Sequence, residues 1–493
     1  MKIVISFITL FAISCSIFGQ SEKEMVINTI DKNSIQGHIY FLADDLLKGR
    51  ETGTPENKIA ASYLANTLRS YGVMPNPLTG TYYQEVPLTK VEPPKRVNLE
   101  VNGKSIKKKV VLKQDKINFE GQLVFLGYGL GADYKGQDVY KKVVVVEGGS
   151  PNAKDVRAAF GLREQKAELA RRNGAAGLIE LIKTNNETWG FIEHNFNAPR
   201  VAIASENDKR MKGDMAFAHV WAQDEYGSLA LDLQKGTHRV NLVIQNTPEE
   251  SISSNNVVGV VEGTDPILKN EYIIYSAHYD HVGIGKADET GDEIYNGARD
   301  NAVGTTTVLS MAKNLAKYPT KRSALFILFT GEEKGLLGSS FYVENPVIPL
   351  EQMVYCFNSD NGGYNDTTVA TIIGLPRTTA AQNIKDAAQA FGLTAIDDPA
   401  PEQGLFDRSD NVRFAAKGIP APTFSMGFRS FDGEVTKYYH QPGDHADSMD
   451  YDYLEKFFRA YVLAGRNIAN DPETPFWTAG DKYEQAGKKL YKQ

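Results

Sequence analysis

The segment FTGEEKGLLGSS, residues 329–340, places two carboxylates side by side directly after an apolar run. The run, residues 324–329, is typical of a strand that is buried on both faces, as in the parallel sheet of an α/β protein. Acidic residues also favour the first turn of a helix, so Glu332 and Glu333 could simply cap a helix that begins here. The choice between capping and a chemical role therefore depends on the rest of the chain.

Polar side chains follow several other apolar segments in the second half of the sequence. In open α/β sheets, ligands bind beyond the carboxyl ends of the strands, so these side chains are expected to converge. They are His278, Asp280, His281, Asp300, Glu332, Glu333, Asp360 and His440. Nitrogen and oxygen atoms from histidine and carboxylate groups are typical ligands of zinc.

Each of these residues also has an ordinary structural explanation. A lone histidine at a strand end is more often only hydrogen-bonded, Asp300 could cap a helix, and Asp360 could lie in a turn. Supporting roles of this kind are expected for His281, Asp444 and His445. The combination nevertheless favours a metal site, because buried unpaired charges are unfavourable and a divalent cation compensates them.

Strand-like and helix-like segments alternate from about residue 250 onward. The strand-like segments are NEYIIYSAH, ALFILFT, QMVYCFNSD and APTFS, and the helix-like ones are GTTTVLSMAKNLAK and TAAQNIKDAAQAFG. A final helix is expected from about Asp452. This alternation predicts an α/β fold with a mixed, mostly parallel sheet that helices cover on both faces.

The sequence before residue 250 predicts two further parts. In the first, mainly helical part, Thr54 is a candidate N-cap and Pro55 suits the first helical position. The second part is rich in strand-like segments such as KKVVVVEGG and GAAGLIELI, which favour a separate β-rich module. The expected parts are a leader over residues 1–20, the helical part over 21–117, the module over 118–248, the α/β domain over 249–475 and a tail over 476–493.

The first twenty residues, MKIVISFITLFAISCSIFGQ, have one lysine, then an apolar stretch, then small residues. This is the pattern of a secretory signal peptide, which predicts export to the periplasm or the cell exterior. In an alternative interpretation, a lipid on Cys15 would anchor the protein, although the three residues before it make a poor lipoprotein signal. Without the leader, Cys356 is the one remaining thiol, so an intramolecular disulfide is not expected.

Length and composition exclude some classes of protein. A chain of 493 residues exceeds one ordinary core, and at about 150 residues per domain it predicts two or three domains. The fractions of hydrophobic residues, 42%, and charged residues, 23%, are those of a globular protein. The net charge of -7 and the lack of a basic run argue against nucleic-acid binding. No segment after the leader has the roughly 18 continuous apolar residues of a transmembrane helix.

Five ordered motifs resemble the co-catalytic dizinc aminopeptidase family, which includes aminopeptidase Y, bacterial leucyl aminopeptidase and glutamate carboxypeptidase II. The motifs are SAHYDHVG, GARDNAVG, FTGEEKGLLGS, NSDNGG and YYHQPGD, and the match around them covers essentially all of residues 250–470. The resemblance implies the zinc exopeptidase fold. The β-rich module resembles the protease-associated domain that many members contain. The segment FLADDLLKGRETGTPENKIAASYL resembles the lead-in of secreted members.

The resemblance also implies two zinc ions per chain and a role for each matching residue. His278 and Asp360 would hold one ion, Glu333 and His440 would hold the other, and Asp300 would bridge both. Two ions ~3.5–4 Å apart can hold one water between them and lower its pKa towards ~7.

Four further expectations concern residues around these ligands. Glu332 would be the general base that takes the proton of the water and delivers it to the leaving amine. Asp280 would accept the other N–H of the His278 imidazole and fix its tautomer. Tyr439 would donate to the oxyanion, or it would simply pack in the core. Family members have a cis peptide bond after the bridging aspartate, so the bond after Asp300 is expected to be cis.

The function that these features predict is a secreted zinc aminopeptidase that acts on peptides. The aromatic residues near the expected mouth favour Leu, Phe or Met side chains; they are Phe406, Phe428, Phe431 and Tyr438. Many secreted members have Ser-Asp-His where residues 409–411 read Ser-Asp-Asn, and this difference bears on substrate preference near that loop. Neither the oligomeric state nor a preferred residue follows from the sequence.

Three alternatives remain open on the same fold. A carboxypeptidase would need a basic cluster for the terminal carboxylate of its substrate, whereas Arg408, Arg413 and Arg429 are scattered. A glutaminyl cyclase, which is an acyltransferase, would use one zinc ion. A receptor-like binding protein, as in the transferrin receptor, would have lost the metal. Zinc content would separate the zinc exopeptidase, the cyclase and the receptor-like protein, with about two, one and no ions per chain.

Overall fold

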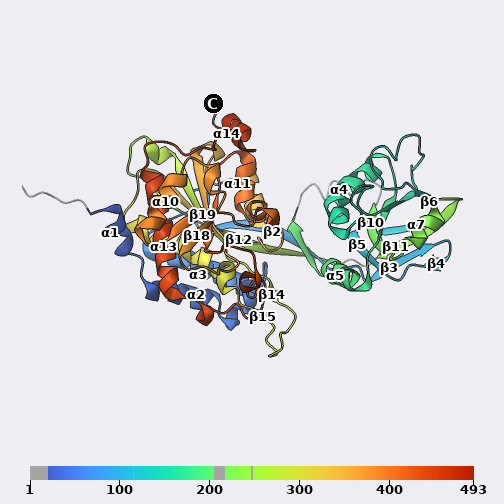
Figure 1. Cartoon of the computed structure of the whole chain (residues 1–493), viewed down its shortest axis with the longest axis horizontal. Helices are drawn as coiled ribbons and strands as arrows, with labels where there is room; N and C mark the ends of the chain where they lie inside the picture. Colours follow the sequence, from blue (N-terminus) through green and yellow to red (C-terminus); the bar gives the residue numbers. More distant parts are fainter. Residues whose placement is uncertain (1–19, 115, 205–216, 246–247, 493) are drawn as a thin grey trace, which may run out of the picture. The chain divides into compact units, whose positions relative to one another are not determined.

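The computed structural model describes residues 20–114, 116–204, 217–245 and 248–492 (Figure 1). The chain forms two compact units, one of Met1–Val86 with Ser254–Gln493 and one of Pro87–Ser253. The predicted signal peptide, including Cys15, lies almost entirely outside the described residues. No helix in the described part is long and apolar enough to cross a membrane.

A large mixed sheet forms the centre of the first unit. The strands along it run in the order β19-β18-β20-β17-β13-β16-β12-β2. Their bounds are β2 (Tyr83–Val91), β12 (Glu249–Val261), β13 (Tyr272–His278), β16 (Ser323–Phe329), β17 (Met353–Ser359), β18 (Val369–Ile373), β19 (Thr394–Asp397) and β20 (Thr423–Met426). Strand β13 pairs in parallel with both β16 and β17, while β12 pairs antiparallel with β16. The predicted mixed, mostly parallel sheet is confirmed.

Short strands extend this frame at its margins. β1 (Met74–Pro75) pairs antiparallel with β12, and β14 (Gly283–Ile284) pairs with β15 (Ile294–Tyr295) in a separate two-stranded ribbon. This ribbon lies in the loop between β13 and the next helix, α8 (Gly304–Lys317). The loop between the motifs SAHYDHVG and GARDNAVG therefore has its own local structure.

Alternate residues of the central strands point into two separate hydrophobic cores. In β13, Ile273 and Tyr275 belong to one core, whereas Ile274 belongs to the other, as the two-residue period of a strand requires. Helices α2, α3, α8, α10 and α13 contribute to the first core, and α9 and α11 contribute to the second. Helices on both faces of the sheet were predicted, and Figure 1 shows this layered arrangement.

The helices of the first unit follow local sequence signals. Their bounds are α1 (Glu22–Ile27), α2 (Lys32–Leu42), α3 (Pro55–Tyr71), α8 (Gly304–Lys317), α9 (Leu337–Glu344), α10 (Ala381–Ala390), α11 (Asn411–Lys417), α12 (Gly433–Thr436), α13 (Tyr451–Asn470) and α14 (Glu484–Leu490). Thr54 caps α3 by accepting from Asn57 N, and Pro55 is its first residue, as predicted. The segment 476–493, expected to be a tail, contains α14, and its Trp477 is buried and donates to Gly418 O.

The expectation that residues 21–117 are mainly helical is wrong for its second half. Helix α3 ends at Tyr71, and β2, β3 (Arg96–Val101), β4 (Lys104–Ser105) and β5 (Lys109–Gln114) follow. The side chains of β2 alternate between buried and exposed from Gln84 to Leu88, which is the pattern of a strand with one covered face. In the sequence, this short alternation is a weaker signal than the helical spacing of the residues before it.

The second unit is built on an eight-stranded sheet in the order β4-β3-β11-β6-β7-β8-β10-β5. Its remaining elements are β6 (Ile117–Phe125), β7 (Val143–Glu147), α4 (Val156–Arg172), β8 (Gly177–Ile182), α5 (Asn186–Phe196), β9 (Arg200–Ile203), β10 (Ala218–Gln223), α7 (Ser228–Leu233) and β11 (His238–Gln245). Residues 88–91 of β2 pair with β9 within this unit. The unit, Pro87–Ser253, is wider than the segment 118–248 expected for the β-rich module.

Candidate metal centre

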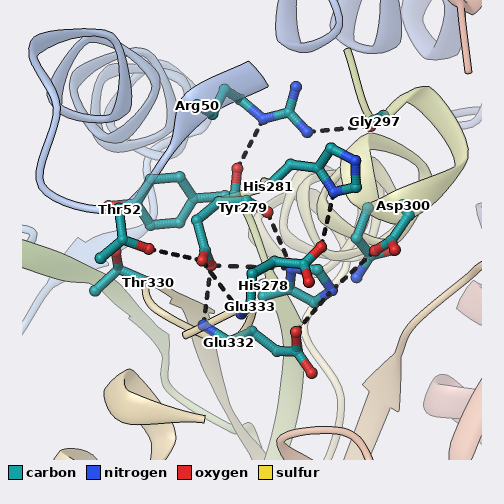
Figure 2. A network of polar contacts seen from close by, with 12 residues as sticks. Arg50, Thr52, His278, Tyr279, His281, Gly297, Asp300, Thr330, Glu332 and Glu333 are labelled. Carbon is teal, nitrogen blue, oxygen red and sulfur yellow. Dashed lines mark hydrogen bonds and ion pairs between the residues drawn. The ribbon is translucent and has the colours of Figure 1, made fainter. Parts of the chain in front are cut away.

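The predicted metal-binding side chains lie together at the carboxyl ends of the central strands. β13 ends at His278, and Asp360 directly follows β17. Asp300 lies in the turn before α8, and Glu333 lies in the turn after β16. His440 reaches the same place from the segment after α12. Figure 2 shows how the side chains of His278, Asp300 and Glu333 lie together.

Two groups of ligand atoms are close enough to hold a metal ion among the described residues. One group is His278, Asp300 and Asp360, the other is His281, Asp300, Glu333 and His440, and the ligand atoms of each lie within 4.8 Å of one another. Asp300 belongs to both groups. Its Oδ1 lies 3.3 Å from His278 Nε2, and its Oδ2 lies 3.2 Å from His440 Nε2. One carboxylate therefore offers a separate oxygen to each group, and its peptide bond to Asn301 is cis, as predicted.

The distances between ligand atoms fit zinc. His278 Nε2 lies 3.2 Å from Asp360 Oδ1, and His440 Nε2 lies 3.1 Å from Glu333 Oε2. In a tetrahedral zinc site with bonds of ~2.0–2.1 Å, neighbouring ligand atoms are ~3.3 Å apart. The nitrogen and oxygen donors are also of the chemical type that zinc prefers. The residues present can therefore hold zinc in each group.

His281 differs from the other members of its group. Its Nδ1 lies 2.8 Å from Glu333 Oε1, which is a hydrogen-bond distance and shorter than the separation of two zinc ligands. Its Nε2 is buried and has no hydrogen-bond partner among the described residues. This geometry fits the expected supporting role, in which His281 orients Glu333.

Asp280 makes its contacts in a different way from the one expected. His278 Nδ1 lies 3.1 Å from the main-chain oxygen of Asp280 and 3.9 Å from its carboxylate. A carbonyl can only accept, so Nδ1 carries the proton and Nε2 presents its lone pair to Asp300 and Asp360. The Asp280 carboxylate instead accepts from the main-chain N–H groups of Glu332, at 3.1 Å, and Glu333, at 3.4 Å. Burial raises the pKa of the Asp280 carboxyl.

Asp444 supports the other side of the centre. Its carboxylate accepts from the main-chain N of Arg299 and of Asp300, and from the Arg299 guanidinium at 2.9 Å. His445 lies 3.4 Å from Asp292 and belongs to neither ligand group. Asp444 holds the turn that carries Asp300, which agrees with the supporting role expected for it, whereas the contact of His445 is with a residue outside both ligand groups.

The two adjacent glutamates have opposite electrostatic environments. Burial raises the pKa of Glu332 well above its ordinary value, and the negative charges of Glu333 and Asp360 add to this effect. Burial and Asp300 also act to raise the pKa of Glu333, but hydrogen bonds from His281 and His440 outweigh them and hold it at about 2. Glu332 is thus the better proton acceptor and Glu333 the permanent anion, a division typical of catalytic pairs.

A cavity opens over the metal-binding side chains. Besides the ligands, its lining includes Ile373, Leu405, Arg408, Phe428, Phe431, Val435 and Tyr439. The Tyr439 hydroxyl lies 3.2 Å from Arg408 Nη2, and its ring stacks on His440 with centroids 4.1 Å apart. The polar side of the cavity therefore faces the ligands, and the remaining wall is largely apolar.

The aromatic residues predicted at the mouth divide into two pairs. Phe428 and Phe431 line the cavity, but Phe406 packs against Arg377 and Tyr438 packs against Arg299. Apolar residues that the sequence did not single out, Ile373 and Leu405, take part in the lining instead. Sequence spacing within loops does not fix the direction of a side chain, so this part of the prediction was wrong for Phe406 and Tyr438.

Residues 409–411 contact the site from one side. Ser409 lines the cavity, and Asn411, where many relatives have histidine, is buried and donates to Ala421 O at 3.0 Å. Asp410 between them is fully buried, and burial raises its pKa to about 7. The departure at Asn411 is therefore accommodated by a main-chain hydrogen bond away from the ligands.

Comparisons with known proteins agree with this site. Residues 256–464 match peptidase family M28. Aminopeptidase YwaD of Bacillus subtilis (strain 168) is 27% identical over 299 residues, which cover 59% of this chain and 57% of the relative. A probable zinc metalloprotease of Pyrenophora teres f. teres (strain 0-1) is 25% identical over 360 residues, covering 64% of this chain and 70% of the relative. The chain thus spans little more than half the length of the Bacillus relative.

The fold is similar to that of a solved aminopeptidase from Aneurinibacillus sp. strain AM-1. The TM-score is 0.61 at 21% identity, and the alignment covers 92% of this chain and 97% of the other. The residues matched by the family model include His278, Asp300, Glu333, Asp360 and His440. Residues 256–464 therefore carry the match to peptidase family M28, and the relatives named aminopeptidase and zinc metalloprotease support a zinc-dependent peptidase.

Proposed function

We propose that the protein is an exported aminopeptidase that holds two zinc ions and removes N-terminal apolar residues from peptides. The shared Asp300 carboxylate supports this proposal best, because each of its oxygens faces a different histidine. His278 and Asp360 would hold one ion, and Glu333 and His440 would hold the other. Zinc in such a site polarises the scissile carbonyl and lowers the pKa of an attacking water. The predicted leader would deliver the enzyme outside the cytoplasm, with anchoring through Cys15 as the alternative.

Glu332 is the proposed general base. Its Oε2 lies 4.0 Å from His278 Nε2, so the carboxylate faces the ligands without belonging to either group. The Glu332 carboxylate would take a proton from the attacking water and deliver it to the leaving amine. A raised pKa favours both steps, because the carboxylate then accepts the proton readily and is still acidic enough to protonate the amine.

Tyr439 is the proposed donor to the oxyanion. Arg408 Nη2 donates to the tyrosine oxygen, so the Tyr439 hydroxyl proton is free to be donated into the cavity. Replacing Tyr439 by phenylalanine is expected to lower kcat about 10²–10³-fold, since one such donor is worth ~3–4 kcal/mol in the transition state. Steady-state kinetics on Leu-p-nitroanilide would measure this change. An unchanged kcat would assign Tyr439 to packing on His440 alone.

The cavity supports an apolar substrate side chain and argues against a carboxypeptidase. Arg408 is the one arginine of the cavity lining, whereas Arg429 pairs with Asp366 outside it. A single exposed cation does not form the basic cluster that a terminal carboxylate needs. Ile373, Phe428 and other apolar lining residues would instead bury an aliphatic or aromatic side chain, at about 25 cal/mol per Å². Two ligand groups also favour an aminopeptidase over a one-zinc cyclase.

The proposal predicts a specific substrate profile for the zinc-loaded protein. Leu-p-nitroanilide should be cleaved, and its N-acetylated form should not be, because acetylation removes the free amine next to the scissile bond. A peptide ending in glutamate should lose its first residue and not its last. The three reactions are followed by absorbance and mass spectrometry. Turnover confined to release of the C-terminal glutamate would refute the aminopeptidase and support a carboxypeptidase.

A further inference from the structure

The segment of residues 48–54, just before α3, lies against the loops that carry the metal ligands. Lys48, Gly49 and Arg50 all have left-handed backbone conformations, with φ of 44°, 67° and 50°. A Cβ atom on Gly49 would come within 2.6 Å of the main-chain oxygen of Gly283, so only glycine allows this approach. Glu51 forms a parallel bridge with His281. The backbone of the segment is therefore fitted closely to the loop that follows β13.

Arg50 connects two ligand-bearing loops. Its guanidinium is fully buried and donates to the main-chain oxygens of Leu42, of Tyr279 at 2.8 Å, of Asn296 at 2.6 Å and of Gly297 at 3.0 Å. Figure 2 shows the contacts with Tyr279 and Gly297. Tyr279 directly follows His278, and Gly297 begins the turn that contains Asp300. One side chain thus holds both loops at a set separation.

The positive charge of Arg50 also interacts with four carboxylates around the site, of which Asp300 and Glu333 belong to the ligand groups. Burial lowers the pKa of Arg50 to about 10, and the nearby charges of Asp280, Asp300, Asp444 and Glu333 act to raise it. All of its hydrogen bonds in the structure go to main-chain carbonyls, so its positive charge remains available to the carboxylates around it. In the zinc-free protein, this charge reduces the repulsion between the carboxylates of the site.

Thr52 connects the segment to the glutamate pair. Its hydroxyl donates to Asp280 Oδ2 at 2.8 Å, and Thr52 itself is 4% exposed. The same Asp280 carboxylate accepts from the main-chain N–H groups of Glu332 and Glu333. Lys334, the next residue, donates to Glu51 Oε1 at 2.7 Å. The segment therefore reaches the turn after β16 at two points.

We propose that residues 50–52 are a positioning element of the metal centre: Thr52 acts through Asp280 on Glu332 and Glu333, and Arg50 acts on the loops of His278 and Asp300. The proposal rests on the proposed role of those residues as metal ligands and general base. Residues that orient ligands in this way commonly change metal affinity or activity by about 10–100-fold when they are mutated. A role confined to fold stability would lower the unfolding temperature and leave the zinc affinity of the folded protein unchanged.

The first test replaces Thr52 by valine, which keeps the shape and removes the hydroxyl. Asp280 then loses one of its three donors, so Glu332 and Glu333 are less firmly oriented. We expect the zinc dissociation constant, measured by competition with a chelator, to rise about 10-fold or more, and kcat to fall with little change in KM. Thr52→Ser keeps the hydroxyl and is expected to restore both values towards those of the wild type.

Thr320→Val is the matched control. Thr320 is also buried, and its hydroxyl donates to the main-chain oxygen of Arg322, before the start of β16, whereas Glu332 and Glu333 follow the other end of that strand. The Thr320→Val replacement should change the unfolding temperature only. Wild-type zinc affinity and kcat in Thr52→Val, or changes no larger than those in Thr320→Val, would overturn the proposal.

Arg50→Lys gives an independent test that keeps the charge. An ammonium cannot reach the four carbonyls that the guanidinium fork holds, so zinc affinity should fall here as well. Zinc affinity also tests the positioning element separately from the proposed aminopeptidase function. If the wild-type protein fails to cleave Leu-p-nitroanilide, the proposed function fails, while a zinc affinity that is weaker in Thr52→Val than in Thr320→Val still supports the positioning element.

Discussion

Replacing Glu332 by glutamine is expected to lower kcat by about 10²–10⁴-fold while the zinc content stays at the wild-type level. Glutamine keeps the size of the side chain and the main-chain N–H that donates to Asp280. It cannot take up a proton, which is the step assigned to this residue. Since Glu332 belongs to neither ligand group, its replacement leaves the zinc ligands in place.

Glu333→Gln is the matched control for this experiment. Both oxygens of Glu333 are engaged, Oε2 at 3.1 Å from His440 Nε2 and Oε1 at 2.8 Å from His281 Nδ1. An amide replaces one of these oxygens by an NH₂ group, which neither binds zinc nor accepts from His281. The zinc content should therefore fall in this variant. Equal zinc content in the two variants, measured by atomic emission after dialysis, would show that the two roles are assigned wrongly.

The positions of the ligands could be predicted because they are tied to strand ends. The candidate ligands His278 and Asp360 directly end or follow strands that are largely apolar and buried along almost their whole length, which is typical of parallel strands in the centre of a sheet. Once the strands align, their carboxyl ends meet, and the side chains that follow must meet as well. The cis bond after Asp300 followed from the family resemblance and not from the local sequence.

The supporting residues could not be predicted in the same way. Thr52 and Asp280 are 228 positions apart, and neither stands in a pattern that indicates the other. Asp280 was expected to contact His278 through its carboxylate, but the turn directs its main-chain oxygen there and turns the carboxylate towards Thr52. Contacts of this kind depend on the exact path of a loop, which spacing in the sequence does not determine.

The limits of pattern reading are also visible in β2. β2 begins only twelve positions after the strong helical pattern of α3, and its buried residues, Gln84, Val86 and Leu88, include a polar one. A mixed polar and apolar inner face gives a weak two-residue period. Because this period is weak, the sequence places the start of the β-rich module at residue 118, whereas the compact second unit begins at Pro87.

Replacing Asp300 by alanine is expected to have the largest effect on metal content. Each oxygen of Asp300 faces a different histidine, at 3.3 Å for His278 and 3.2 Å for His440, so alanine removes one ligand from both groups at once. Zinc should fall from about two ions per chain to well below one, and activity should be lost with it.

Asp360→Ala provides the comparison that makes this result specific. Asp360 Oδ1 lies 3.2 Å from His278 Nε2, and Asp360 belongs to the first ligand group alone. The second group, with Glu333 and His440, stays complete in this variant, so about one zinc ion per chain should remain after dialysis. Loss of a bridging carboxylate should therefore release more zinc per chain than loss of a carboxylate that belongs to one group alone. If Asp300→Ala and Asp360→Ala retain the same amount of zinc, Asp300 does not bridge two ions, and the one-zinc alternative takes precedence over the dizinc aminopeptidase.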